Sequence, residues 1–406
     1  MSLPGVVIRI GGVAAECDVR RASLIHGRDD PSSQPSADAA TLELLGVLPA
    51  EARIGSPLAV YADWLGVEVP RFAGRISDIA VRWDAPDIPL ATVIAVGELA
   101  ELGRRKIIGG GAGAGMGEQL DGQRADRALL MAGVTRDPAR SDPGTLYLYA
   151  RDVAPAGLLA TVPAAEITLE AAVSGNGMVW QATDGAVLYA DAEHRRGEPP
   201  AVTIDACDVP LDINWRLGLE GLCNDATIGY GNVQPKAEVY ATNAASIAEH
   251  GTYAATLATA LRDAPEAVKR ADLIVARQAS PAWVVDGLAF PLEAEYVDPA
   301  LTDALLGLEV HSLLTLTGLP SSSPYPAAHL FVEGWTERIE GGGPDGPGGW
   351  LLTLAVSEYC RTAPPPRWDD VAATWLWDAI DPALTWDSIT CLAPPLPASG
   401  GTAHGG

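Results

Sequence analysis

The sequence predicts a mainly β protein in which two similar β-barrel domains flank an α+β insertion and an extended Trp-rich segment follows. Three observations lead to this prediction. The 406 residues are 48% hydrophobic but include only 3 Phe and 4 Met, so the expected core consists of small aliphatic side chains. The 43 Gly and 32 Pro suit many short strands joined by tight turns better than a helical bundle. A strand pattern that occurs twice in the chain is the third observation.

Residues 1–100 are expected to form the first barrel domain. Short apolar runs at 6–8, 58–61 and 92–96 are separated by turn residues, and residues 72–79 alternate apolar and polar in their second half. No alternation of helices with strands interrupts this series. The pattern is therefore typical of an antiparallel sandwich or barrel.

Residues 101–200 are expected to form the α+β insertion domain. Helices are predicted at 118–133, where Gly133 is placed to end the helix, and at about 155–172. An Asp-Gly pair at 184–185 lies between two apolar runs, and this pair favours the tight turn of a β-hairpin.

Residues 201–363 are expected to form the second barrel domain, with one Ala- and Leu-rich helix near 252–277. The order of strands and loops in residues 53–96 recurs in residues 309–356. In both copies 22 residues separate a glycine in the middle strand from the valine that ends the last strand. Two copies of one barrel-like domain explain this likeness, and a chance similarity between two β-meanders is the alternative.

Residues 364–406 are expected to form a docking segment with a flexible tail. After three prolines, the pattern Trp-Asp-x-(Val/Ile) occurs three times at intervals of 9 residues. We expect each Trp to fill a pocket on a partner or on a neighbouring subunit, because Trp offers a large apolar area and an N–H group. A local Trp cluster that stabilises the end of the chain is the alternative. The expected interaction residues are Trp368, Trp377, Trp386, Asp369, Asp378 and Asp387.

Charge and cysteine content restrict the partners and the compartment. With 27 basic and 52 acidic residues the formal net charge is −25, so the chain should repel duplex nucleic acid and anionic lipid at long range. The short basic run at 104–106 is too small to reverse this. Five scattered cysteines without Cys-x-x-Cys spacing indicate reduced thiols and synthesis in a cytosol. The sequence has neither a signal-peptide pattern nor an apolar run of about 18 residues.

Patterns that carry chemistry are weak. Residues 109–114 formally match the Gly-x-Gly-x-x-Ala nucleotide fingerprint, but no buried parallel strand precedes them, so a flexible loop is the better interpretation. The 6 histidines are isolated from one another and from cysteine. No Gly-x-Ser-x-Gly nucleophile motif is present. We therefore predict no catalytic residue, no cofactor and no metal, and a protein that is not an enzyme.

Several motifs stand in an order that one protein family shares. Residues 28–30 are Arg-Asp-Asp in a turn, residues 41–44 are Thr-Leu-Glu-Leu, and residues 72–76 are Phe-Ala-Gly-Arg-Ile. Residues 123–125 (Gln-Arg-Ala) and 224–231 (Asn-Asp-Ala-Thr-Ile-Gly-Tyr-Gly) continue the match. Over most of its length the chain thus resembles the baseplate-hub or tail-tip proteins of long-tailed phages, of the minor tail protein type found in siphophages of actinobacterial hosts. Tandem Trp-Asp motifs also recur in such proteins.

The resemblance implies a structural virion protein at the tail tip, made in the host cytoplasm. Two tail-tube-like barrels per chain and three chains per ring would give six quasi-equivalent units, which match a hexameric tail tube. The implied partners are two further copies of the chain, a distal tail or tail-tube protein, and other minor tail proteins or a spike or fibre. Phage DNA would pass through the ring without specific binding, and no stable membrane insertion is expected. No fused protease, lysozyme-like or receptor-binding domain is expected either.

Two other functions stay open at this point. A carbohydrate-binding β-protein of the virion or cell surface would use some of the 11 Trp as stacking platforms. A hydrolase with an unrecognised site is the other. A hub should associate with itself and with tail proteins, whereas a glycan-binding protein should be a monomer that a sugar array captures.

Overall fold

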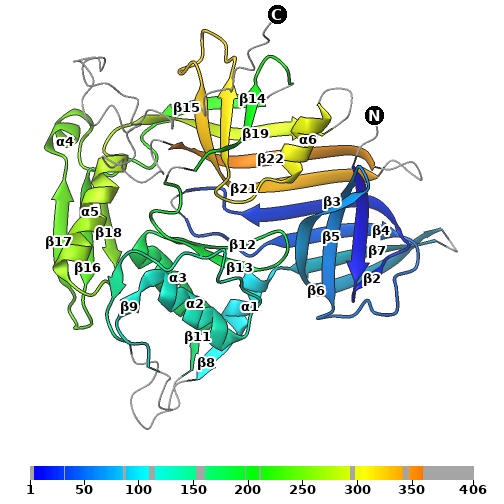
Figure 1. Ribbon diagram of the computed structural model, residues 1–406, viewed down its shortest axis with the longest axis horizontal. Coiled ribbons are helices and arrows are strands. Elements are labelled where there is room, and N and C mark those ends of the chain that lie inside the picture. The colour runs from blue at the N-terminus through cyan, green and yellow to red at the C-terminus, as the bar shows by residue number, and fades with distance from the viewer. Residues whose placement is uncertain are drawn as a thin grey trace, which may run out of the picture.

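The computed structural model describes residues 4–31, 33–85, 88–108, 115–151, 161–196, 198–209, 212–292, 298–341 and 347–359. One 13-stranded sheet, called the large sheet below, dominates this part of the chain (Figure 1). Three helices of the insertion lie below it in Figure 1, and a smaller three-stranded sheet with two helices lies at its left. The prediction of a mainly β protein with an α+β insertion is confirmed.

The first hundred residues supply one half of the large sheet, in which all neighbouring strands are antiparallel. In the fourth strand Ala40, Leu42 and Leu44 are fully buried, so every second side chain enters the core, as expected for a strand with one apolar face. The strands are β1 (Gly5–Ile10), β2 (Val13–Ala14), β3 (Asp18–Gly27), β4 (Ala39–Leu45), β5 (Pro57–Trp64), β6 (Val67–Ala85) and β7 (Ile88–Val96).

Residues beyond 199 supply the other half. Its strands pair antiparallel except for β14 and β20, which are parallel. A short helix, α6 (Pro299–Leu306), contacts β14. The strands are β14 (Pro200–Asp205), β15 (Asp212–Gly218), β19 (Ala282–Pro291), β20 (Leu313–Thr317), β21 (Ala328–Gly341) and β22 (Pro347–Glu358).

The two halves are joined into one sheet by β21 and β3, and the division of the chain into two barrel domains stays a prediction. β21 pairs with β22 along one edge and with β3 along the other, from Gly334 opposite Gly27 to Glu340 opposite Arg21. β21 is 14 residues long, so it can pair with a neighbouring strand over many residues on each of its two edges. One hydrophobic core, which runs from Ile8 to Val356, lies under both halves.

The strand order that suggested an internal repeat is present in both halves. β5, β6 and β7 form one antiparallel meander, and β20, β21 and β22 form another. Each middle strand contains a β-bulge, between Ile76 and Asp78 in β6 and between Val332 and Gly334 in β21. The bulges lie close to the two glycines that define the repeat in the sequence, so they are a shared feature of the two copies.

The pairing register is different in the two meanders. Val96 lies opposite Arg75, the residue after Gly74, whereas Val356 lies opposite Val332, which precedes the glycine of its strand by two positions. The equal spacing in the sequence therefore does not produce equal pairing. The observed repeat is one of strand order and bulge position.

Both repeat glycines stand where another backbone approaches closely. A Cβ atom on Gly334 would lie 2.3 Å from the carbonyl oxygen of His26, and one on Gly74 would lie 2.4 Å from the carbonyl oxygen of Val96. Gly334 faces Gly27 in the pair that joins the two halves. Only glycine allows the chain to approach so closely at these places.

Replacing Gly334 with alanine should therefore open the joint between β21 and β3. We expect the free energy of unfolding to fall by about 1–3 kcal/mol, the usual cost of forcing a methyl group into a filled site. The matched control is Gly218→Ala in β15, where a Cβ atom would meet nothing closer than 3.9 Å. Urea denaturation of both variants measures the difference, and equal midpoints would contradict the steric argument.

The insertion and the residues after β15 share a second core that runs from Leu102 to Ala279. Packing thus groups the small three-stranded sheet and its helix α5 with the insertion. The elements outside the large sheet and α6 are α1 (Glu98–Arg104), β8 (Lys106–Ile108), β9 (Gln119–Leu120), α2 (Asp121–Ala132), β10 (Tyr147–Leu148), β11 (Thr161–Pro163), α3 (Ala164–Gly175), β12 (Met178–Gln181), β13 (Val187–Ala190), β16 (Asp225–Tyr230), β17 (Ala237–Thr242), α4 (Ala244–His250), β18 (Ala254–Ala258) and α5 (Ala264–Gln278).

Some predicted element boundaries are confirmed and others are wrong. α2 ends at Gly133, which adopts the left-handed conformation, and the hairpin of β12 and β13 turns at Asp184-Gly185 as predicted. The helix expected near 252–277 begins only at Ala264, after the N-cap residue Asp263. Residues 254–258 form β18 instead, because they pair in parallel with β16. The helix expected at 155–172 is α3, which begins at Ala164 after the short strand β11.

Candidate functional site

The interaction residues predicted from sequence lie outside the described residues. Trp368, Trp377 and Trp386 and the aspartates that follow them all come after residue 359, where the description of the chain ends. The glycine-rich run 109–114 also falls in a gap of the description. The docking function of the Trp-Asp segment therefore stays a prediction.

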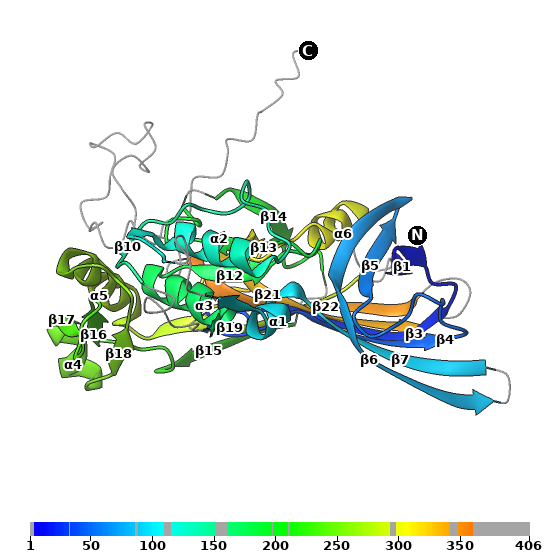
Figure 2. The ribbon, with the colours of Figure 1, turned by 90° about the horizontal axis from the view of Figure 1, so that it is seen from below.

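A long hairpin formed by β6 and β7 projects from the body of the molecule (Figure 2). Near its end the side chains of Val81 and Trp83 are exposed, Trp83 by 65%, as is Ile88 on the return strand. Alternate residues of a strand point to the same face, so Val81 and Trp83 form a small apolar patch. Exposed apolar side chains on a projecting element are typical of a surface that meets another protein.

The tryptophans of the described part of the chain differ in exposure, and Trp215 of β15 and Trp283 of β19 are partly exposed. Trp64, Trp180, Trp335 and Trp350 are buried, and Trp83 alone is a largely exposed tryptophan among the described residues. Stacking of a sugar needs an exposed aromatic face, which the four buried rings lack. The four buried rings therefore offer no face to a sugar.

The outer strands of the large sheet have unpaired edges in the described part of the chain. β15 pairs only with β19 at one end, and at the other end β1 pairs along one edge with β5 and along the other with the two-residue strand β2. An unpaired edge is a row of free N–H and C=O groups that another chain can pair with. These edges are candidate contact surfaces for assembly.

A buried ion pair links the two halves of the large sheet. Arg71 of β6 donates to Oε1 of Glu337 of β21 from Nε and Nη2, at 3.0 and 2.7 Å, and donates to the carbonyl oxygen of Leu306. Trp335 and Trp350 donate their indole N–H groups to the two carboxylate oxygens of Glu337, each at 3.0 Å. Every carboxylate oxygen is thus satisfied, as a buried charge requires.

A second buried carboxylate joins three parts of the chain. Oε1 of Glu333 accepts from Nη1 of Arg195 at 2.7 Å and from the hydroxyl of Ser357. Oε2 accepts from Nε of Arg28 at 2.8 Å. Nε of Arg195 donates to Nδ1 of His311 at 2.8 Å. We call these five residues the Glu333 cluster.

Electrostatics in the Glu333 cluster fix the charge states of its members. Burial alone would raise the pKa of Glu333, but Arg195 and Arg28 outweigh it and lower that pKa to about 2. Burial and the charge of Arg195 lower the pKa of His311 well below its usual value. The imidazole is therefore neutral at physiological pH, so its Nδ1 can accept the hydrogen bond that Nε of Arg195 donates.

Arg270 and Arg277 of α5 carry buried guanidinium nitrogens, and we call these two residues the α5 arginine site. Among the described residues, buried Nε and Nη2 of Arg277 have no hydrogen-bond partner, and the same holds for Nε of Arg270. Burial, followed by the charges of Arg270 and Arg195, lowers the pKa of Arg277 to about 9. Burial lowers the pKa of Arg270 to about 10. The carboxylate of Glu193 partly opposes this lowering of the pKa of Arg277.

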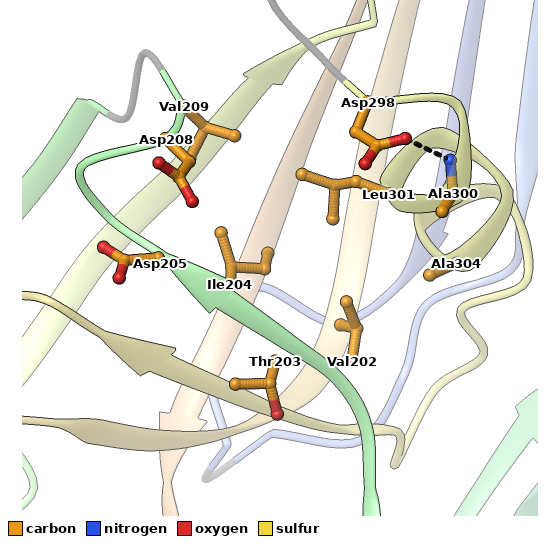
Figure 3. A pocket seen from close by; sticks show the side chains of 10 residues that line it. All are labelled: Val202, Thr203, Ile204, Asp205, Asp208, Val209, Asp298, Ala300, Leu301 and Ala304. Carbon is orange, nitrogen blue, oxygen red and sulfur yellow. Dashed lines mark hydrogen bonds between the residues drawn. The ribbon is translucent and has the colours of Figure 1, made fainter. Parts of the chain in front are cut away.

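A shallow pocket of about 310 Å³ lies between β14 and α6 (Figure 3). Apolar side chains such as Ile204 and Leu301 line it, and three aspartates stand around it. Asp298 caps α6 through the N–H of Ala300, at 3.0 Å, and Asp205 accepts from the N–H of Cys207 at 2.9 Å. Two of the three carboxylates therefore serve the local backbone.

The part of the chain that the structure describes offers neither a metal site nor a membrane-spanning helix. No group of three or more His, Cys, Asp or Glu side chains there could hold a metal ion. None of the helices described there is long and apolar enough to cross a membrane.

Comparisons with known proteins identify the fold. No protein-family model matches the sequence, and no curated protein matches it in sequence. The structure is similar to the 43 kDa tail protein of prophage MuSo2 from Shewanella oneidensis, with a TM-score of 0.58, 14% identity and coverage of 87% of this chain and 98% of that one. This chain has the fold of a phage tail protein. A tail protein from Neisseria meningitidis MC58 is similar as well, with a TM-score of 0.56, 13% identity and coverage of 86% and 95%.

The phage-tail resemblance read from the sequence motifs is confirmed at the level of the fold. The sequence did not reveal the two charge clusters, because Arg28, Arg195 and Glu333 are far apart in the chain. One local signal for the α5 arginine site did exist. Arg270 and Arg277 are seven positions apart, a spacing that places two residues on one face of a helix.

Proposed function

We propose that this protein is a structural, non-enzymatic component of a phage tail tip, where three copies form a hub ring. The ring would join the hexameric tail tube to distal tail-tip or receptor-binding components and enclose the DNA channel. The observation that carries the proposal is the structural likeness, which extends over nearly the whole length of a phage tail protein. The protein would be made in the host cytoplasm and located in the virion.

The strand arrangement supports a ring with approximate sixfold symmetry. Each chain contributes two meanders of equal strand order, β5–β7 and β20–β22, so three chains present six such units. The free edges of β15 and β1 and the exposed patch of Val81 and Trp83 supply surfaces for contacts between subunits. Closed symmetry would cover edges that otherwise favour aggregation.

The Trp-Asp segment is proposed to recruit the next tail-tip component. Repeated Trp residues suit this role, since tryptophan anchors contribute a large share of the affinity of many interfaces. The net charge of −25 suits a channel through which DNA passes, because a surface that bound phosphate groups would retard it.

The stoichiometry of the protein tests this function. Native mass spectrometry of the purified protein at increasing concentration should give a species of three times the 42.2 kDa chain, and electron cryo-microscopy of tail tips should place it in a threefold ring. Three chains in one ring, or six chains in two stacked rings, are consistent with the hub. Any other number of chains would contradict it. A monomer at every concentration that a glycan array captures would favour carbohydrate binding instead.

A further inference from the structure

Residues 191–196 connect the insertion to the second half of the large sheet, between β13 and β14, and we call them the return segment. All six are described, and none of them belongs to either hydrophobic core. Five of the six are titratable. On the insertion side, Nδ1 of His194 and the N–H of Asp191 both bind Oδ2 of Asp142, at 2.8 and 3.0 Å. Polar contacts therefore hold the segment in place.

The contact of the return segment with the large sheet depends on His311. Nε of Arg195 donates to Nδ1 of His311 at 2.8 Å, and Nη1 donates to Glu333 at 2.7 Å. An arginine is always protonated in proteins and has no acceptor atom. Nδ1 of His311 must therefore be the unprotonated nitrogen of a neutral ring. A second proton on the ring would place one donor against another and break this hydrogen bond.

Positive charges around His311 strengthen this effect. After burial, the charges that disfavour a second proton on the ring come from Arg195, His194 and Arg28. The rings of His194 and His311 lie 4.8 Å apart between centroids. Glu333 is the carboxylate of this cluster, and it already accepts hydrogen bonds from both arginines. A charged His311 would give this one carboxylate three cations to balance.

The backbone of His311 has an unfavourable conformation. Its φ is 76°, in the left-handed region that residues other than glycine seldom adopt. Its N–H donates to the carbonyl oxygen of Val332 at 2.8 Å. Glu309, two positions earlier, binds the hydroxyl of Thr183 at 2.9 Å instead of the ring. Loss of the contact with Arg195 therefore removes an interaction that helps to hold a strained backbone.

We propose that His311 is an acid-sensitive latch, whose neutral ring holds Arg195 and the return segment against β21 and whose protonation releases them. The hairpin of β12 and β13 stays packed in the first core during this change, so the opening is local. The latch thus makes the connection between the insertion and the large sheet sensitive to pH. This conclusion does not depend on a trimeric ring.

The acid response has a definite sign. In the closed return segment the ring of His311 is neutral, whereas in the open segment it regains its usual pKa of 6.5. The fraction of open segment should therefore rise about tenfold for each pH unit below that value. Burial raises the pKa of Asp191 to about 6 in the closed segment, so Asp191 acts in the opposite direction. A variant of His311 that keeps Asp191 separates the two effects.

Hydrogen–deuterium exchange of the full-length wild type and of His311→Asn at pH 7 and pH 5 tests the latch. The side-chain oxygen of asparagine can accept from Arg195 in place of Nδ1, it takes no proton, and asparagine tolerates a positive φ. After correction for the intrinsic effect of pH on exchange, the amides of residues 193–196 should be similarly protected at pH 7. At pH 5 the variant should be roughly twentyfold better protected than the wild type.

His329→Asn on β21 is the matched control. Nδ1 of His329 lies 3.0 Å from the hydroxyl of Thr315 rather than beside an arginine, so this variant should follow the wild type at both pH values. Equal pH dependence in the wild type and His311→Asn would overturn the proposal. A parallel loss of protection in β4 at pH 5 would show global unfolding and would also contradict a local latch.

A measurement on the wild type tests the latch without any substitution. Nuclear magnetic resonance of protein labelled with nitrogen isotope in its 6 histidines distinguishes the two ring nitrogens of each. At pH 7 the ring of His311 should be neutral, with its proton on Nε2 and none on Nδ1. A proton on Nδ1 at this pH, in a neutral or a charged ring, would show that the ring does not accept from Arg195, and the proposal would be wrong.

Discussion

Replacing Glu333 with glutamine should lower the free energy of unfolding by about 3–5 kcal/mol, the cost of removing one partner from a buried ion pair. Glu333 is fully buried, and its carboxylate balances both Arg28 and Arg195. Glutamine has almost the same shape, so the loss is one of charge and not of packing. Urea denaturation monitored by tryptophan fluorescence measures the effect.

The same substitution on the same strand provides the control. Glu340 of β21 pairs with Arg21 of β3 at 3.1 Å, but both side chains are more than half exposed. Glu340→Gln should therefore cost less than about 1 kcal/mol. Similar urea midpoints for the two variants would show that burial does not govern the strength of these ion pairs.

Acid should reduce the difference between the wild type and Glu333→Gln. The pKa of Glu333 is lowered to about 2 in the folded protein, from 4.5 in the unfolded chain. Its contribution to stability is therefore complete above pH 4.5 and is lost as the pH falls through that value toward 2. The gap in urea midpoint should be equal at pH 7 and pH 6 and smaller at pH 4. A gap that widens in acid would contradict the lowered pKa.

Truncation after Arg367 should give a folded protein that fails to recruit the next tail-tip component. The change removes all three Trp-Asp units and no described residue, so the urea midpoint should stay close to that of the full chain. Truncation after Pro394 keeps the three units and serves as the control. Complementation of a phage that lacks the gene measures recruitment. Complete and infectious tails from the chain ending at Arg367 would show that the segment is dispensable.

A single substitution gives the same test at finer scale. Trp377→Ala should weaken binding of the distal component roughly thirtyfold, because truncation of an interface tryptophan commonly costs about 2 kcal/mol. Trp375 lies two positions earlier, and no aspartate follows it. Trp375→Ala is therefore the matched control and should have a much smaller effect. Equal losses in the two variants would contradict the Trp-Asp repeat as the unit of binding.

Local features were predictable because neighbouring residues determine them. A left-handed backbone at Gly133 ends α2, and the Asp184-Gly185 pair turns the hairpin of β12 and β13, both as the sequence indicated. For residues 254–258 the local sequence predicted the wrong element. Its Ala-rich composition suits a helix, but pairing with β16 makes it a strand. Such pairing depends on a segment about thirty residues away.

Assembly of the candidate sites depended on contacts between distant residues. The sequence by itself determined the mainly β class, the strand order of both meanders and the Trp-Asp repeat, since each is a periodic pattern in the chain. Tertiary structure decided that β21 pairs with β3 across about three hundred residues, and that Arg195 meets both Glu333 and His311. Edge pairing and buried charge compensation are satisfied by whichever groups the fold brings together, and no local pattern specifies which groups those are.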